Sequence, residues 1–598
     1  MAPTHRVCAA VIAALAVGIY ANTLGHGYAL DDRLVITHNE FVRAGWSGLP
    51  KILTEDYLRG YLAEKANPMT GGRYRPLSLV TFAVEAAVFG PDHPFVGHLL
   101  NVLLYALCCV LFYRVAASLL LSERAPPDGW LSVPFLAALF FTVHPLHTEV
   151  VANIKSRDEI LALSFALASL LLALRAVDRK QRAPAIGAAV CFFLALFSKE
   201  SAITFLAVLP LSLWFFRTPA RAGLMRVMPG IAGAAVAYLA LRAIFVAGPA
   251  APSGELLNDP FLGASRADTW ATIFYVLGRY AQLMVWPHPL THDYAPYHIA
   301  IQSWRDAGPW LGLGVQLGLA GLALSGARTR SIPAYAAAFY LATLSIGSNA
   351  VVPTGTFLAE RFLFAPSAGA ALGFAWALRA GVDRLAPGPR RRTVAVALGI
   401  AAAVALGALT VLRNPAWQDS YTLFTTDVAV SRESALANAN VADVMLIRAS
   451  ETADPGERAR LEGDAVAHLE TALRVHPRYE RALEMLSVAQ GRRGDMDASL
   501  ATVERLFALN PRRGKVAFNA GTIILERHPE RSADAVRYLE RAVEIQPDDA
   551  DARANLGVAY YQTGDLARAI ASFERAVALA PDRADHRANL EQLRAERR

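Results

Sequence analysis

Residues 7–24 read VCAAVIAALAVGIYANTL, an apolar stretch of 18 residues that follows Arg6. A helix of about this length crosses the ~30 Å hydrocarbon layer of a bilayer. Comparable stretches recur up to residue 412, and none follows. The whole chain has 54% apolar residues, only 18% charged residues and a mean hydropathy of +0.31. Together with the apolar stretches, this composition predicts a multi-pass membrane protein. The first stretch has no convincing small-residue cleavage site, so we expect it to be an uncleaved helix.

About eleven membrane spans are predicted if the N-terminus is cytoplasmic. Every cytoplasmic connection then carries basic residues, as the positive-inside rule requires. Residues 75–89 and 270–286 are left out because the first stretch is short and carries Glu85, whereas the second would invert all later loops. We expect residues 270–286 to lie at the outer membrane interface and residues 75–89 to form an interfacial or re-entrant helix. The predicted spans are residues 7–24, 97–120, 131–148, 158–176, 184–198, 201–216, 227–246, 309–326, 332–350, 362–379 and 393–412.

The chain carries its basic surplus in the membrane part. Residues 413–598 hold 26 Lys and Arg against 29 Asp and Glu, so the net charge of +7 comes from residues 1–412. Basic cytoplasmic loops explain this surplus, and no basic motif with interleaved aromatic residues points to nucleic acid. The four cysteines lie within apolar stretches without metal-site spacing, and we expect them to be small buried residues.

The C-terminal region has a regular repeat. Its prolines at positions 477, 511, 547 and 581 recur at intervals of 34, 36 and 34 residues, the tetratricopeptide period. We therefore predict an all-α solenoid of about four helix pairs over residues 435–598, after a linker at residues 413–434. Such repeats typically bind an extended protein segment, although a packed solenoid without any site would show the same period. Chemistry is expected in residues 1–412.

Charged residues gather at the predicted external ends of the spans. The pair Asp31 and Asp32 could be a hydrated helix cap, and each neighbouring pair of opposite charges could be a local salt bridge. His144, His147 and Glu149 could suggest a metal site, but Pro145 disrupts a common helical face and no third imidazole is near. A network that orients a hydroxyl or a phosphate is favoured. The other members of this external set are Lys155, Arg157, Asp158, Lys199, Glu200, Glu360 and Arg361.

The order of the motifs resembles the transmembrane-and-tetratricopeptide-repeat (TMTC) O-mannosyltransferases over nearly the whole chain. The motifs are DD at 31–32, YRPL at 74–77, HPLHTE at 144–149, SRDE at 156–159, SKES at 198–201, PHPLTHDY at 287–294 and ERFLFAPS at 360–367. The resemblance implies that residues 1–412 form a GT-C glycosyltransferase domain. Such an enzyme moves a sugar, with inversion, from a polyprenyl-phosphate donor to Ser/Thr hydroxyls of proteins.

The resemblance also implies roles for the external residues. Asp31 or Asp32 would deprotonate the acceptor hydroxyl, and Arg157, Lys199 and Arg361 would bind the donor phosphate. The lipid-linked sugar would be a co-substrate, so no metal or other cofactor is expected, in keeping with a sequence that has no GxxxxGK[ST] loop. The residues expected to orient the substrates are His144, His147, Glu149, Asp158, Glu200 and Glu360.

We expect a bacterial inner membrane, with the active site and the repeats on the periplasmic side and undecaprenyl phosphate as carrier. The composition rich in Ala, Arg and Gly, the few repeats and a final AERR without an endoplasmic-reticulum retention signal favour this location. Two alternatives remain open. One is a GT-C transferase for a glycolipid or cell-envelope polymer, and the other is a non-catalytic membrane scaffold, which would not need polar groups gathered on one face.

Overall fold

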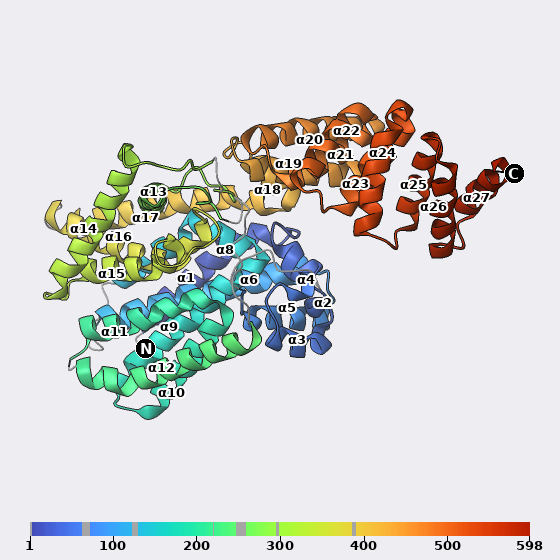
Figure 1. Ribbon diagram of the computed structural model, residues 1–598. Coiled ribbons are helices and arrows are strands. Elements are labelled where there is room, and N and C mark those ends of the chain that lie inside the picture. Colours follow the sequence, from blue (N-terminus) through green and yellow to red (C-terminus); the bar gives the residue numbers. More distant parts are fainter. Residues whose placement is uncertain are drawn as a thin grey trace. The chain divides into compact units, whose positions relative to one another are not determined.

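A computed structural model describes residues 3–62, 72–121, 129–218, 220–246, 259–294, 298–385 and 390–597. Every regular element within these ranges is helical, which confirms the predicted all-α class. The chain divides into two compact units, Met1–Ser431 and Arg432–Arg598 (Figure 1).

Within the described residues, seven helices are long and apolar enough to cross a membrane. They are α1 (Pro3–Tyr20), α6 (Pro94–Leu120), α9 (Arg157–Asp178), α12 (Ala220–Phe245), α14 (Ala307–Ala327), α16 (Phe364–Leu385) and α17 (Arg390–Arg413). An eighth candidate is a broken span in which α7 (Val133–Val143) meets η5 (Pro145–His147) and α8 (Thr148–Ala152) at an angle of 53°.

Three of the eleven predicted spans correspond to shorter apolar helices. These helices are α10 (Arg182–Ser198), η7 with α11 (Glu200–Thr204 and Phe205–Phe216) and α15 (Ile332–Leu344). Each has fewer residues than the ~20 that a perpendicular span requires. Length and composition therefore support seven or eight of the eleven spans. The two stretches left out of the prediction form α5 (Pro76–Phe89) and α13 (Arg266–Val285).

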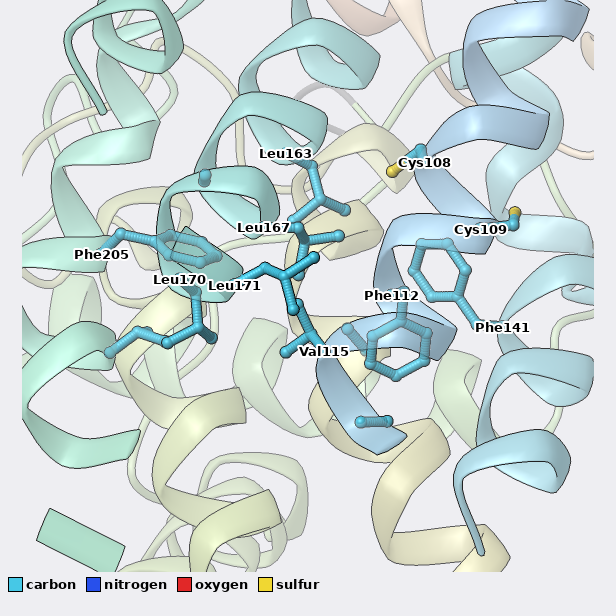
Figure 2. Packing of buried hydrophobic residues seen from close by; sticks show 14 of the residues in the cluster. Cys108, Cys109, Phe112, Val115, Phe141, Leu163, Leu167, Leu170, Leu171 and Phe205 are labelled. Carbon is cyan, nitrogen blue, oxygen red and sulfur yellow. The ribbon is translucent and has the colours of Figure 1, made fainter. Parts of the chain in front are cut away.

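Helix α9 lies at the centre of the first unit. In its apolar window 72% of the residues are buried, against 6% in α14. Figure 2 shows leucines 163, 167, 170 and 171, spaced along one side of α9, close to Phe112 of α6, Phe141 of α7 and Phe205 of α11. Cys108 and Cys109 lie in the same cluster and, like Cys8, are buried as expected, whereas Cys191 is only half-buried. Because α9 starts at Arg157, this central helix carries Asp158 and Glu159 at its first turn.

Short helices build the predicted external segments. They are η2 (Arg33–Thr37), α2 (Glu40–Arg43), η3 (Gly45–Gly48), α3 (Leu49–Thr54), α4 (Arg59–Leu62), η6 (Ile154–Ser156) and η9 (Glu360–Leu363). The short helices η1 (Ala21–Thr23) and η8 (Ile346–Ser348) lie at the external ends of predicted spans, whereas η4 (Gly129–Leu131) lies at a predicted cytoplasmic connection. The first loop has its own small core, which includes Val35, Phe41 and Phe82. This core fixes the loop that carries Asp31 and Asp32 against α5.

The predicted linker, residues 413–434, mostly belongs to the first unit. It contains η10 (Asn414–Trp417) and α18 (Ser420–Asp427), and the first unit ends only at Ser431. Trp417 is fully buried. An apolar side chain of this size anchors its segment by removing a large area from water.

The second unit consists of four helix pairs and a final helix. The pairs are α19/α20 (Ala435–Glu451, Pro455–Val475), α21/α22 (Glu480–Arg492, Met496–Leu509), α23/α24 (Gly514–Arg527, Ser532–Ile545, with η11 at Pro529–Arg531 between them) and α25/α26 (Ala550–Gln562, Leu566–Leu579), followed by α27 (Ala584–Glu596). A methyl group added at Gly557 would lie 2.6 Å from the ring of Phe573. The predicted alternation of small and large residues therefore lets the two helices of this repeat approach closely.

Candidate active site

A cavity of about 510 Å³ in the first unit is lined by predicted external segments and by residues of α9, α12 and α15. Part of its wall is charged and part is apolar. The apolar residues Ala162 and Ala166 lie on α9, one and two turns beyond Glu159, so this wall extends along the central helix. The charged lining residues are Asp31, Arg73, Arg75, Lys155, Glu159, Lys199, Glu200, Arg242 and Arg361.

The two adjacent aspartates have different environments. The side chain of Asp31 is 37% exposed, lines the cavity and places Oδ2 4.0 Å from Nζ of Lys155. Asp32 is fully buried and accepts hydrogen bonds from the backbone N–H groups of Ala29, at 3.0 Å, and Lys155, at 2.7 Å. Burial raises the pKa of Asp32 to about 7, although both N–H groups oppose the shift. Asp31 thus faces the cavity, whereas Asp32 fastens two chain segments together.

Asp158 forms ion pairs with three cationic side chains from three different segments. Its carboxylate lies 2.9 Å from Nη1 of Arg75, 3.8 Å from Nζ of Lys155 and 3.7 Å from Nζ of Lys199. These cations occupy helix boundaries: Arg75 precedes α5, Lys155 lies in η6 and Lys199 precedes η7. Asp158 itself is fully buried at the start of α9. It therefore orders the cations from behind the cavity wall.

Other carboxylates fix the same cations individually. Glu200 accepts two hydrogen bonds from Arg75, with Nε at 2.7 Å and Nη2 at 2.5 Å. Glu159 lies 2.5 Å from Nζ of Lys199. These pairs hold charged groups in place before any ligand arrives, which reduces the cost of ordering them later.

Glu149 holds Arg361, another cation of the cavity wall. The backbone N–H of Arg361 donates to Oε2 of Glu149 at 2.9 Å, and the guanidinium of Arg361 donates to Oε1. Glu149 is 2% exposed and sits in the short helix α8. Among the residues expected to orient substrates, Glu149, Asp158 and Glu200 therefore contact the cations of the cavity.

Arg157 lies outside the cavity lining, in contrast to its predicted role as a phosphate ligand. Its fully buried guanidinium donates to Oδ1 of Asn101 at 2.7 Å, pairs with Glu85 and stacks 4.5 Å from the ring centre of Phe82. These partners hold the guanidinium between α5, α6 and α9, away from the residues that line the cavity.

His144 and His147 also lie outside the cavity lining. His144 Nε2 lies 3.1 Å from the carbonyl oxygen of Met284. The ring nitrogens of His147 lie 2.8 Å from the hydroxyl of Tyr105 and 2.9 Å from the hydroxyl of Ser367. Both imidazoles therefore join segments in the interior of the first unit. Among the described residues, no three His, Cys, Asp or Glu side chains form a group that could hold a metal ion.

Glu360 supports a neighbouring external loop. Its Oε1 accepts hydrogen bonds from the backbone N–H of Thr291, at 2.8 Å, and from the hydroxyl of Tyr294, at 2.9 Å. Glu360 is 1% exposed and does not line the cavity. Its contribution to the site is indirect, through the position of the adjacent Arg361.

Four of the charged lining residues, Arg73, Arg75, Glu159 and Arg242, have no role predicted from the sequence, and Lys155 is predicted only as a member of the external charged set. Arg73 and Arg75 flank Tyr74 of the YRPL motif, so an external arginine pair was visible in the sequence. Burial and the nearby Arg75 lower the pKa of Arg73. Arg242 lies three residues before the end of α12 and donates to the carbonyl oxygen of Gly72 at 3.2 Å. Only the fold brings this helix to the cavity.

Comparisons with known proteins agree with parts of this organisation. Two family models, both described as tetratricopeptide repeat, match residues 463–522 and 523–594. Protein O-mannosyl-transferase TMTC2 of Mus musculus is 31% identical over 205 residues, which cover 33% of this chain and 23% of the relative. Protein O-mannosyl-transferase TMTC4 of Homo sapiens is 24% identical over 493 residues, which cover 74% of this chain and 64% of the relative.

A further relative, protein O-mannosyl-transferase Tmtc3 of Drosophila melanogaster, is 25% identical over 487 residues, covering 71% of this chain and 51% of the relative. The chain thus spans less than two thirds of each of these relatives. Among solved structures, the tetratricopeptide-repeat protein YrrB is 21% identical, with a TM-score of 0.25. The aligned region covers 29% of this chain and 83% of the YrrB chain. The chain therefore carries tetratricopeptide repeats and has homologues, at modest identity, among the TMTC protein O-mannosyl-transferases.

Proposed function

We propose that the chain is an integral-membrane glycosyltransferase that moves mannose or another hexose from a polyprenyl phosphate to Ser/Thr hydroxyls of proteins. The observation that carries this proposal is the cavity in which the half-exposed Asp31 shares a wall with anchored cations and an apolar surface. The names of the homologues support a glycosyltransferase. In this proposal the charged part of the cavity wall binds the phosphate of the donor, and the apolar part binds its lipid.

The donor would bind through its phosphate and its lipid. Lys199 and Arg361 are the proposed phosphate ligands, with Lys155 as a third cation, because all three line the cavity. Charge-assisted hydrogen bonds to phosphate are strong, and these cations are already held by carboxylates. The prenyl chain would lie along Ala162 and Ala166, whose small side chains leave room beside α9. Arg75 is assigned a positioning role because Glu200 and Asp158 occupy its guanidinium.

The proposed reaction is a single displacement. Asp31 accepts the proton of the acceptor hydroxyl while that oxygen forms a bond to the anomeric carbon of the sugar. The bond between this carbon and the phosphate oxygen breaks, and its electron pair leaves with the polyprenyl phosphate. Attack opposite to the leaving group inverts the anomeric centre. A positioned base of this kind contributes about 10²- to 10⁴-fold. Because the donor is already activated, the proposed reaction requires neither a nucleotide sugar nor a metal cofactor.

The proposed setting is a bacterial inner membrane with the cavity and the repeats facing the periplasm. The repeats would bind protein acceptors and raise their effective concentration near the cavity. Tetratricopeptide repeats generally mediate protein–protein contacts, in line with this role.

Transfer of label tests the proposal in vitro. The full chain in lipid nanodiscs is incubated with radiolabelled polyprenyl-phosphate mannose and periplasmic proteins from cells that lack the gene. We expect label on Ser/Thr residues, reduced at least about 100-fold by Asp31→Asn. Asp92→Asn is the control, because Asp92 forms an exposed pair with Arg43 and does not line the cavity. Label that appears only in glycolipid would overturn the proposed acceptor class.

A further inference from the structure

Residues 413–431, here called the strap, hold the loop that leads into Asp31. The carbonyl oxygen of Gln418 accepts a hydrogen bond from the backbone N–H of Gly27 at 2.8 Å. The Ser420 hydroxyl accepts one from the backbone N–H of Leu30 at 3.1 Å. These bonds join segments almost 400 residues apart in the sequence and end one residue before Asp31.

The backbone at Leu30 needs such support. Its φ is +51°, in the left-handed region that costs free energy for a side chain larger than glycine. A conformation of this kind persists only where surrounding contacts hold it. The hydrogen bond from the backbone N–H of Leu30 to the Ser420 hydroxyl is one of these contacts. The strap therefore helps to set the backbone conformation before Asp31, and with it the orientation of the Asp31 side chain.

The same strap holds a second loop, which leads towards Arg361. The Ser431 hydroxyl lies 2.8 Å from the Thr291 hydroxyl and donates to the carbonyl oxygen of Asp293 at 3.0 Å. The backbone N–H of Thr291 donates in turn to Glu360, the residue before Arg361. A buried series of hydrogen bonds therefore connects the end of the strap with the neighbour of a cavity cation.

Asp427 fixes this second connection with charge. It accepts a 2.6 Å hydrogen bond from the backbone N–H of His292 and two from the guanidinium of Arg413, at 2.5 and 2.8 Å. Burial alone would raise the pKa of Asp427, but Arg413 and His292 outweigh it and lower the pKa to about 2. Asp427 is therefore ionised at neutral pH, and the loop with Thr291 and His292 stays fastened to α18.

We propose that the strap is a positioning element of the active site. Its Ser420 fixes the position of Asp31, and its Ser431 fixes the position of Arg361. This inference rests on the proposed function for the roles of Asp31 and Arg361. It predicts that the two connections act separately. Loss of the Ser420 contact impairs the chemical step, because it displaces the base. Loss of the Ser431 contact weakens donor binding, because it displaces a phosphate ligand.

Hydrogen–deuterium exchange on the full chain in nanodiscs tests the connections without reference to catalysis. We expect Ser420→Ala to increase exchange in residues 25–36 and leave residues 287–294 unchanged, and Ser431→Ala to do the reverse. Thr425→Ala is the matched control, because the Thr425 hydroxyl donates only to carbonyls of Tyr421 and Thr422 within α18. It should change neither region. Ser420→Thr keeps the hydroxyl and should restore the protection lost in Ser420→Ala.

Steady-state transfer of mannose from polyprenyl-phosphate mannose adds the functional test. We expect Ser420→Ala to lower kcat about 3- to 10-fold at unchanged donor KM, and Ser431→Ala to raise donor KM by a similar factor. Unchanged exchange in both variants, or equal increases in both regions in each variant, would overturn the strap. The expected local exchange together with no transfer by the unmodified chain would instead overturn the proposed function and leave the strap intact.

Discussion

The backbone N–H of Lys155 donates a 2.7 Å hydrogen bond to Oδ1 of Asp32, while the ammonium group of the same lysine lies 4.0 Å from Oδ2 of Asp31. Lys155 therefore contacts two neighbouring carboxylates through different groups. The contact with Asp32 is buried and structural, whereas the contact with Asp31 lies at the cavity wall. This arrangement separates a proposed base, Asp31, from a residue that holds it in place.

The burial of Asp32 predicts a pH dependence of stability. Its pKa of about 7 in the folded chain exceeds the value of about 3.9 expected in the unfolded chain. Between these values the folded state binds a proton that the unfolded state has released, so the free energy of unfolding falls as the pH rises from about 4 to about 7. We expect Asp32→Asn to flatten this slope in thermal unfolding at pH 5, 6 and 7. Equal slopes in both proteins would refute the assignment.

The hydrogen bonds between Glu149 and Arg361 predict an effect on donor affinity. Glu149→Gln removes the negative charge and one of the two acceptors, which releases the guanidinium from its present position. We expect donor KM to rise about 10-fold or more, because an interaction with a buried charge is lost. Arg361→Lys should raise KM as well, since lysine cannot reproduce the fork of the guanidinium. A donor KM that is unchanged in Glu149→Gln would exclude this role.

The buried ion pairs of Arg75 predict that its substitution strongly lowers the free energy of unfolding. Arg75→Met leaves Asp158 and Glu200 without the guanidinium that they share. Removing one partner from a buried ion pair costs about 3–5 kcal/mol. The matched control is Arg43→Met, which breaks an exposed pair with Asp92 and should cost less than about 1 kcal/mol. Chemical unfolding in detergent measures both variants, and similar losses would contradict the central position of Arg75.

The position of the strap predicts different outcomes for two truncations. A chain that ends after Ser431 keeps the whole first unit, whereas one that ends after Leu412 lacks the strap. We expect the longer chain to retain cooperative thermal unfolding and donor binding but to transfer sugar to proteins more slowly at low acceptor concentration, because it lacks the repeats. The shorter chain should unfold at a lower temperature. Transfer to proteins at the normal rate by the longer chain would refute the proposed role of the repeats in binding acceptors.

Much of the fold follows from local sequence patterns. Hydropathy marks the long spans, and the proline period marks the repeats, because both signals lie within single helices or helix pairs. The prediction is weakest where the helices are short: the predicted spans at α10 and α11 already have only 15 and 16 residues, and α15 ends at Leu344, six residues before the end of its predicted span. Composition alone does not distinguish a buried short helix from a span.

The site was predictable as a set of charged external residues but not as a geometry. Asp31 and Asp32 are adjacent and chemically identical, and only burial separates them. Arg157 has the residue type of a phosphate ligand, but Glu85 and Asn101 occupy its guanidinium. The pairing of Arg75 with Glu200 joins residues 125 positions apart and leaves no local pattern in the sequence.

The most direct measurement is mass spectrometry of Ser/Thr-linked hexose on membrane and periplasmic proteins. Cells with the intact gene are compared with a deletion and with the deletion complemented by the intact gene, Asp31→Asn or Asp92→Asn at equal expression. The account predicts that the hexose disappears in the deletion, returns with the intact gene and with Asp92→Asn, and stays absent with Asp31→Asn. Protein glycans that are the same in all five strains would contradict the proposed transferase.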